Sequence, residues 1–412
     1  MQTSALALLR HNRPFSFLWC SRSISFVGDS LGLIALLLYV ATSTGRPFDV
    51  ALLMLVGDFA PTLLSPLTSA LGSRFDARTL MMLCEVGQGA LTATIGLGLP
   101  VLPALLVLVA LRTTLGQLFG PAARVAVPLL VTDDEIETAN AALGFGTHGM
   151  DAFAPLFAAA LLPWLQIRGL LLIDAMTYLI SALLLSQLPS LPRMVTETGD
   201  ERSLLRETRE GLSYIWSHPA VRIVIVGFFA IVACNAMDDV ALVFLARGPL
   251  HAGNSVTSLL YAGVGSGLLL GFAALSRYAR TLSLPLLLVV GFGLHSAGNL
   301  LTGLSWTIAL AFGMQGIRGV GISMMDVASN SLLQRLVPPA LRGRVLGNFG
   351  GAIGSAAGLS YVVGGLMLGH LSPRLVFILA GSAGLVAALI VGLILPKTLS
   401  ATPAKMAHAT PP

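Results

Sequence analysis

Long apolar runs separated by short polar gaps fill almost the whole chain. Each run is bounded by Gly, Pro or charged residues, and each is close to the roughly 20 residues that a helix needs to cross a bilayer. Inside lipid, a segment must satisfy its own backbone N–H and C=O groups, which a helix does and an open strand does not. The pattern therefore predicts twelve membrane-spanning helices, over residues 16–42, 50–72, 79–99, 103–124, 139–165, 169–187, 220–246, 254–276, 282–303, 306–330, 346–369 and 374–395.

The composition of the chain agrees with a membrane protein. Hydrophobic residues make up 55% of the 412 residues and charged residues only 10%, a balance that a water-soluble surface does not tolerate. The net charge of +5 is spread over short loops without interleaved aromatic residues, so we expect no nucleic-acid binding. The three cysteines have no CxxC or CxxH spacing, and we expect neither a disulfide framework nor a metal site.

The distribution of Lys and Arg predicts which side of the membrane the loops face. An even number of spans puts both termini on one side, and cytoplasmic loops carry the excess of Lys and Arg. Most cations of this chain lie on the termini and on every second loop. We therefore expect a multi-pass protein of the inner (plasma) membrane with both termini in the cytoplasm; the few cations opposite the termini are Arg46, Arg168, Arg247 and Arg374.

The longest polar segment divides the chain into two sets of six spans. We predict an N-terminal bundle over 1–187, a cytoplasmic linker over 188–219, a C-terminal bundle over 220–396 and a disordered cytoplasmic tail over 397–412. Within the linker, RSLLRETREGLSYIW has helical spacing with charges away from its leucines, which predicts an amphipathic helix along the membrane surface.

The two halves resemble each other. Arg112 in span four and Arg318 in span ten each precede glycines and stand half the chain length apart. Basic pairs also recur after spans two and eight. Related six-helix halves place a substrate site at their interface near the middle of the bilayer; the basic pairs are Arg74 with Arg78 and Arg277 with Arg280.

Four local sequences give the chain a family resemblance: RHNRPFSFLW with SISFVGDSLG, ALGSRFDAR, PAARVAVPLLV with ETANAA, and NSLLQRLVPPALRGRVLG. With these marks the chain resembles the major facilitator superfamily, and more narrowly its drug and siderophore exporter branch, which includes macrolide and enterobactin efflux proteins. The resemblance implies an all-α fold of two pseudo-symmetric six-helix bundles. It also implies proton coupling at Arg112, in RTTLG, and a helix bend at Pro155.

The same resemblance assigns basic residues of the predicted cytoplasmic loops to gate loops. Besides the two repeated pairs, the loop after span ten contributes Arg342 and Arg344.

Ionisable groups within the spans are the candidate functional residues, because such a group is costly in lipid. The embedded carboxylates are Asp29, Asp58, Glu85, Asp151, Asp174, Asp238, Asp239 and Asp326. With a rise of about 1.5 Å per residue, Asp29, Asp151, Arg112 and Arg318 come deepest, and we assign them to a central cavity.

Asp29 and Arg112 form the leading candidate pair. An Arg keeps its proton, whereas an Asp beside it can exchange one, so substrate and proton can compete for the same charged environment. The alternative is a purely structural pair that fastens two helices. His148 and Asp151, one turn apart, either extend a proton path or only hydrogen-bond between helices.

The other embedded charges have simpler expected roles. Arg318 either faces an anionic substrate or binds Asp326. We expect Asp238 and Asp239 at a solvated outer end of span seven, and Asp58 and Asp174 near the outer boundary. For Glu85 we expect a structural pair with Arg74 or Arg78. These expectations rest on distance from the predicted span ends.

These features predict a secondary transporter rather than an enzyme. We expect export of a small amphipathic compound by proton antiport with alternating access, driven by the proton gradient without a cofactor, by a protein that acts as a monomer. A proton-coupled importer or a uniporter is the alternative among transporters. A membrane receptor or enzyme would need a large soluble domain or a cluster of nucleophile, base or metal ligands, and the sequence has neither; its Gly-rich runs lack the Lys-Ser/Thr ending of a nucleotide loop.

Overall fold

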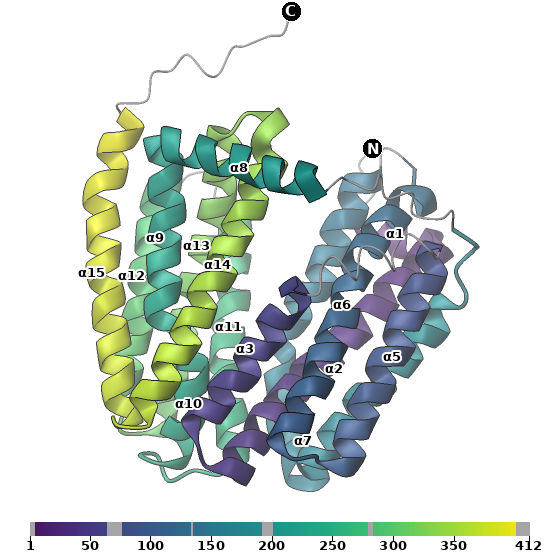
Figure 1. The fold of residues 1–412 in the computed structure, drawn as a ribbon, viewed down its shortest axis with the longest axis horizontal. Coiled ribbons are helices and arrows are strands. Elements are labelled where there is room, and N and C mark those ends of the chain that lie inside the picture. Colours follow the sequence, from purple (N-terminus) through teal and green to yellow (C-terminus); the bar gives the residue numbers. More distant parts are fainter. Residues whose placement is uncertain (1–4, 64–75, 133–134, 192–200, 279–282, 401–412) are drawn as a thin grey trace, which may run out of the picture.

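The structure, a computed structural model, describes residues 5–63, 76–132, 135–191, 201–278 and 283–400. The elements over these residues are helices (Figure 1). In chain order they are α1 Ala5–His11, α2 Arg13–Thr44, α3 Pro47–Leu63, α5 Ala77–Gly98, α6 Leu102–Leu130, α7 Ile136–Leu185, α8 Glu201–Ser217, α9 Pro219–Asn235, α10 Asp238–Arg247, α11 Asn254–Tyr278, α12 Leu284–Gly303, α13 Ile308–Leu336, α14 Pro339–Leu368 and α15 Pro373–Ser400.

Ten helical stretches in the described residues are long and apolar enough to cross a membrane, against twelve predicted from the sequence. Two features account for the difference. The predicted second span is described only as far as Leu63, as the 17-residue α3. The predicted fifth and sixth spans lie on either side of Gln166 within the 50-residue α7, where the backbone leaves helical geometry with φ 56° and ψ −175°, and they count as one stretch. The all-helical polytopic fold is confirmed.

The helices form two groups joined by α8 (Figure 1). One group contains α1 to α7 and the other α9 to α15, and α8 runs across the helix ends on one side of the molecule. The start of α1 and the end of α15 lie on this same side. We call it the α8 end.

Three hydrophobic cores show how the two groups meet. One core is shared, because it contains Leu37 and Val50 of the first group together with Leu242 and Phe377 of the second. The other two each belong to a single group, one around Phe228 in the second group and one in the first. The single-group cores contain residues near the α8 end of their helices. The groups therefore pack together away from α8 and have separate cores at the α8 end.

Two glycines of α14 bring the second group against α3 of the first. A Cβ atom at Gly358 would lie 2.3 Å from the Phe59 ring, and one at Gly365 would lie 2.7 Å from Ala51 Cβ. Larger side chains at either position would push the two helices apart. This seam belongs to the end where the groups share a core.

The amphipathic helix predicted in the linker is present as α8, and it docks on the second group. Arg344 Nη1 donates to Glu210 Oε2 at 2.5 Å, Asn348 Nδ2 donates to the Thr208 carbonyl at 3.0 Å, and the Tyr214 hydroxyl donates to a backbone carbonyl of α13 at 3.1 Å. These contacts tie α8 to the ends of α13 and α14.

The start of α2 is fixed by a side-chain cap. Asn12 Oδ1 accepts a hydrogen bond from the Phe15 N–H at 3.0 Å, and Pro14 stands in the first turn, where its missing N–H costs nothing. The Asn12 amide also donates to the Leu130 carbonyl at the end of α6, at 2.6 Å. One side chain therefore caps one helix and ties it to another.

Replacing Asn12 with Ala is expected to cost about 1–2 kcal/mol of stability, because it removes both the cap and the bond to α6. Asn12→Ser keeps a cap acceptor and removes only the amide bond to α6, so its loss should be smaller. Thermal unfolding of the purified protein in detergent measures both. Equal melting of Asn12→Ala and wild type would contradict the role of the cap.

Candidate substrate and coupling site

A buried ion-pair cluster lies inside the first group, around Arg112 of α6. Arg112 Nη2 lies 2.5 Å from Asp29 Oδ1 on α2 and 3.5 Å from Asp174 Oδ2 on α7. Arg112 also donates to the Tyr178 hydroxyl from Nε at 3.1 Å and from Nη2 at 2.9 Å, and that hydroxyl donates to Asp29. These four residues, the Arg112 cluster, join α2, α6 and α7.

The two carboxylates of the Arg112 cluster differ in exposure. The Asp174 side chain is 0% exposed, whereas 32% of the Asp29 side chain is exposed. Asp174 reaches α2 because glycines leave room for it: a Cβ at Gly32 would lie 2.0 Å from Asp174 Oδ2, and one at Gly28 would lie 2.8 Å from Oδ1. Asp29 is thus the carboxylate of this cluster that water or a solute can reach.

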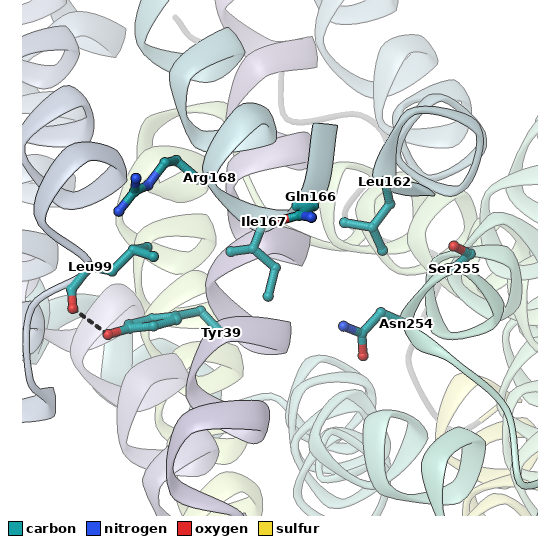
Figure 2. A pocket seen from close by; sticks show the side chains of 8 residues that line it. All are labelled: Tyr39, Leu99, Leu162, Gln166, Ile167, Arg168, Asn254 and Ser255. Carbon is teal, nitrogen blue, oxygen red and sulfur yellow. Dashed lines mark hydrogen bonds between the residues drawn. The ribbon is translucent and has the colours of Figure 1, made fainter. Parts of the chain in front are cut away.

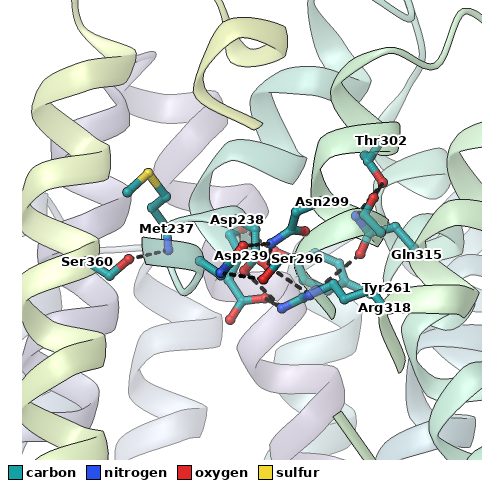
Figure 3. Close-up of polar contacts among 12 residues, drawn as sticks. Met237, Asp238, Asp239, Tyr261, Ser296, Asn299, Thr302, Gln315, Arg318 and Ser360 are labelled. Carbon is teal, nitrogen blue, oxygen red and sulfur yellow. Dashed lines mark hydrogen bonds and ion pairs between the residues drawn. The ribbon is translucent and has the colours of Figure 1, made fainter. Parts of the chain in front are cut away.

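A second ion-pair cluster lies in the other group, around Arg318 of α13 (Figure 3). Its Nη2 donates to Asp238 Oδ1 at 2.9 Å, and its Nε lies 2.8 Å from Asp238 Oδ2 as an ion-pair contact. Nη2 also lies 3.3 Å from Asp239 Oδ1, and Nη1 donates to Gln315 Oε1 at 3.1 Å. Asn299 donates to Asp238 Oδ2 at 2.7 Å. These five residues form the Arg318 cluster.

The Arg318 cluster stands at a break between two helices. α9 ends at Asn235 and α10 begins at Asp238. The backbone N–H of Met237, freed by the break, donates to the Ser360 hydroxyl of α14 at 2.8 Å (Figure 3). Carboxylates in the first turn of α10 also face the positive end of its dipole. Irregular backbone at this depth is tolerated because protein groups satisfy it.

The structure brings together only some of the residues that the sequence singled out. Asp29 and Arg112, the leading candidate pair from the sequence, form an ion pair. Arg318 does not bind Asp326; its partners are Asp238 and Asp239. The expected solvated end is wrong for Asp238, whose side chain is 0% exposed, whereas the Asp239 side chain is 29% exposed. The break between α9 and α10 turns Asp238 into the protein interior.

Asp174 and Glu85 also differ from expectation. The sequence predicts Asp174 near the outer boundary, but it lies fully buried beside Arg112. The expected pair of Glu85 with Arg78 is absent, because Arg78 Nη2 donates to the Ser186 carbonyl at 2.5 Å. The alternative partner Arg74 lies outside the described residues.

The predicted gate-loop residues that are described lie at the α8 end. Arg277 is exposed in the last turn of α11, Arg342 donates to the Val337 carbonyl at 3.1 Å, and Arg344 binds Glu210 of α8. Arg280, like Arg74, is not among the described residues.

Two further features belong to α7 and to the start of α5. The side chains of His148 and Asp151 lie outside the described part of α7. Pro155 lies within α7.

At the start of α5, partial burial alone would raise the pKa of Asp76. Hydrogen bonds from the N–H and the hydroxyl of Thr79 outweigh this effect and hold that pKa below its usual value.

A cavity of about 190 Å³ lies between the two groups, beside the Arg318 cluster. Ser30 of α2, the residue after Asp29, lines it from one group, and Asp239, Tyr261 and Arg318 line it from the other. The rest of its wall is mainly apolar: Leu33, Ile34, Leu37, Pro155, Val264, Gly265 and Leu268. A mixed wall of this kind accommodates an amphipathic solute.

A larger hollow of about 570 Å³ lies near the break in α7 (Figure 2). Gln166 and Arg168 line it from the first group, and Asn254 and Ser255 of α11 line it from the second. The Tyr39 hydroxyl donates to the Leu99 carbonyl at 2.5 Å at its edge. This hollow is separate from both ion-pair clusters.

Two groups of spanning helices, each with a buried Arg–carboxylate cluster and with a cavity between them, define a membrane transport protein. The family model described as Major Facilitator Superfamily matches residues 18–347, and the chain belongs to this family. It is a multi-pass secondary transporter of small molecules and not an enzyme.

Relatives and solved structures agree with this membership. The chain is 25% identical over 389 residues to the uncharacterized MFS-type transporter YfiS of Bacillus subtilis (strain 168), covering 91% of each chain. It is 26% identical over 300 residues to the uncharacterized MFS-type transporter y4rN of Sinorhizobium fredii (strain NBRC 101917 / NGR234), covering 70% of each.

Two crystal structures have the same fold at low identity. A mutant of the nucleoside transporter NupG matches with a TM-score of 0.74 at 12% identity, over 92% of this chain and 99% of its own. A bacterial homologue of the iron transporter ferroportin, in an inward-facing state, matches with a TM-score of 0.72 at 15% identity, over 94% and 99%.

Proposed function

We propose that the protein exports a small amphipathic organic compound, of the drug, macrolide or siderophore kind, in exchange for protons. The resemblance to the exporter branch supports the direction, and the mainly apolar cavity with charged residues on one side supports the substrate class. The observation that carries proton coupling is the Arg112 cluster, in which the partly exposed Asp29 shares one guanidinium with the fully buried Asp174.

Competition within this cluster couples the two solutes. Arg112 keeps its charge throughout, while Asp29 exchanges a proton with water that reaches it. A substrate group that binds ionised Asp29 keeps a proton off this carboxylate, and a proton on Asp29 removes the negative charge that the substrate group binds. The two solutes therefore exclude each other, as an exchange requires.

The packing of the two groups supports alternating access. They share a core away from α8 and have separate cores at the α8 end, the arrangement of a carrier closed on one side and open on the other. We assign the α8 end to the cytoplasm because of the Lys and Arg distribution. Transport then requires the shared core to part while the α8 ends come together.

The remaining assignments follow the same proposal. The protein acts as a monomer in the inner (plasma) membrane, with both termini in the cytoplasm, and uses the proton gradient without a bound cofactor. Its partners are the substrate, protons and the lipid bilayer. Two six-helix bundles over 1–187 and 220–396 move about the linker, and Arg78, Arg277, Arg342 and Arg344 belong to the cytoplasmic gate.

Asp29→Asn tests the coupling, because it keeps the shape of the side chain and removes its titration. A compound is first identified by screening dyes, macrolides and iron chelators against cells that lack their own pumps. In everted vesicles with an established pH gradient, this compound should dissipate the gradient with wild type and should not with Asp29→Asn.

Asp49→Asn, at the start of α3 and outside both clusters, is the matched control and should behave as wild type. Retained gradient dissipation by Asp29→Asn would remove Asp29 from the coupling mechanism. Accumulation of the compound by expressing cells, instead of resistance, would show import.

A further inference from the structure

Glu85 of α5 is a carboxylate buried in the first group, apart from the Arg112 cluster. Its side chain is 0% exposed. The Ser25 hydroxyl of α2 donates to Glu85 Oε1 at 3.3 Å, and Ser181 of α7, which also contacts Ser21 at 2.7 Å, lies within its hydrogen-bonding reach. Glu85 Oε2 has no hydrogen-bond partner among the described residues.

Glu85 also lacks a cation, unlike the other fully buried carboxylates described. Asp174 and Asp238 each lie within 4.0 Å of an Arg. Within the described residues, no Lys, Arg or His comes that close to Glu85. An ionised carboxylate in this position would be neither solvated nor paired, which is strongly unfavourable.

We propose that Glu85 is a proton-binding site of the transporter and holds its proton in this conformation. A proton neutralises the carboxylate and so removes the cost of the missing cation. The proposal rests on the proton coupling proposed above and adds a second site to it. The Glu85 carboxyl can bind a proton, and the neighbouring serine hydroxyls can hydrogen-bond to it both before and after the proton is released.

The position of Glu85 places it between the α8 end and the Arg112 cluster. α5 begins at Ala77 on the α8 side, so Glu85 lies about 12 Å along that helix, whereas Asp29 lies about 24 Å along α2. Ser25, which contacts Glu85, stands one turn before Asp29 on α2. Glu85 therefore lies between the α8 end and Asp29, with Ser25 next to both.

The charged neighbours of Glu85 suggest how the proton is released. On α2, the cationic Arg22 stands one turn before Ser25, and the acidic Asp29 stands one turn after it. The Cys84 thiol precedes Glu85 on α5, and the Ser181 hydroxyl of α7 lies within hydrogen-bonding reach. Arg22 is held elsewhere in this conformation, with its guanidinium 4.9 Å from the ring centres of Phe26 and Phe119.

Movement of Arg22 from the two rings towards Glu85 would supply the missing cation. Glu85 would then release its proton to water or to Asp29, and its carboxylate would pair with Arg22. The number of protons is unchanged in this step; only their place and the partner of Arg22 differ.

Infrared difference spectroscopy of the purified protein in lipid tests the site without a substrate. A protonated carboxylic acid has a C=O stretch that a carboxylate lacks, and this band shifts in D₂O. Glu85→Gln, which keeps the side-chain volume and an oxygen for Ser25, should remove one such band at neutral pH. Asp49→Asn should leave the bands unchanged, and size-exclusion profiles check that both variants are folded.

Two results would overturn the proposal. An unchanged spectrum of folded Glu85→Gln would mean that Glu85 is ionised. Loss of the wild-type band on adding Na⁺ at constant pH would mean that the site binds a metal cation instead of a proton. If Asp29→Asn still dissipates the pH gradient while the Glu85 band is present, the Asp29 mechanism is rejected and the Glu85 site still stands.

Discussion

Arg318→Leu is expected to destabilise the protein by about 3–5 kcal/mol, because it leaves buried carboxylates without their cation. Asp238 loses its hydrogen bond from Nη2, at 2.9 Å, and its ion-pair contact with Nε, at 2.8 Å, and its side chain is 0% exposed. Asn299 remains as a donor but carries no charge. The measurement is the thermal midpoint in detergent, together with the yield of monodisperse protein.

Removing both partners should cost much less than removing one. In Arg318→Leu/Asp238→Asn, the remaining carboxylate of the cluster is Asp239, whose side chain is 29% exposed, so we expect the double variant to recover a large part of the loss. Arg46→Leu, an exposed Arg between α2 and α3, is the matched control and should melt as wild type. A single variant as stable as Arg46→Leu would show that the cluster contributes nothing to stability.

Gly267→Ala is the second substitution with a large expected effect, a loss of about 1–3 kcal/mol or more. A Cβ at Gly267 of α11 would lie 1.9 Å from the Gly316 carbonyl oxygen of α13. The contact recurs nearby, since a Cβ at Gly319 would lie 2.1 Å from the Val264 carbonyl oxygen. Both obstacles are backbone atoms, so relief requires the two helices to separate.

Gly313→Ala on α13 is the control for Gly267→Ala. A Cβ there meets nothing within 4 Å, and alanine in an open helical position is favourable by up to about 1 kcal/mol. Relative to wild type, the thermal midpoint should therefore fall for Gly267→Ala and rise for Gly313→Ala. Equal midpoints would contradict the close approach of α11 and α13.

The sequence was sufficient for the helices and for one ion pair. Apolar runs of bilayer length have few other solutions, so the all-helical fold followed from them. Arg112 and Asp29 stood out because charges are rare at such depth. The gap predicted between the fifth and sixth spans, at residues 166–168, coincides with the break in α7 at Gln166.

The Arg318 cluster was missed for a related reason. The sequence predicts span seven as one helix over 220–246, which carries Asp238 and Asp239 to its end. The break after Asn235 returns Asp238 to the interior, and the polar run of Asn and two Asp residues in an apolar span was the available signal. For Asp174, the available signal was the pair Gly28 and Gly32 on α2, because two glycines one turn apart leave space for a side chain of a facing helix.

The shared core has an electrical consequence for the proposed exporter. A dry layer of hydrocarbon side chains carries most of a transmembrane voltage, while wet regions take the potential of the solution they open to. With this layer on the far side from α8, both Arg clusters lie close to the cytoplasmic potential. A switch that moves the dry layer past them carries their net charge through the field, worth about 2.3 kcal/mol per elementary charge per 100 mV. Membrane voltage, and not acidity alone, would then drive the cycle.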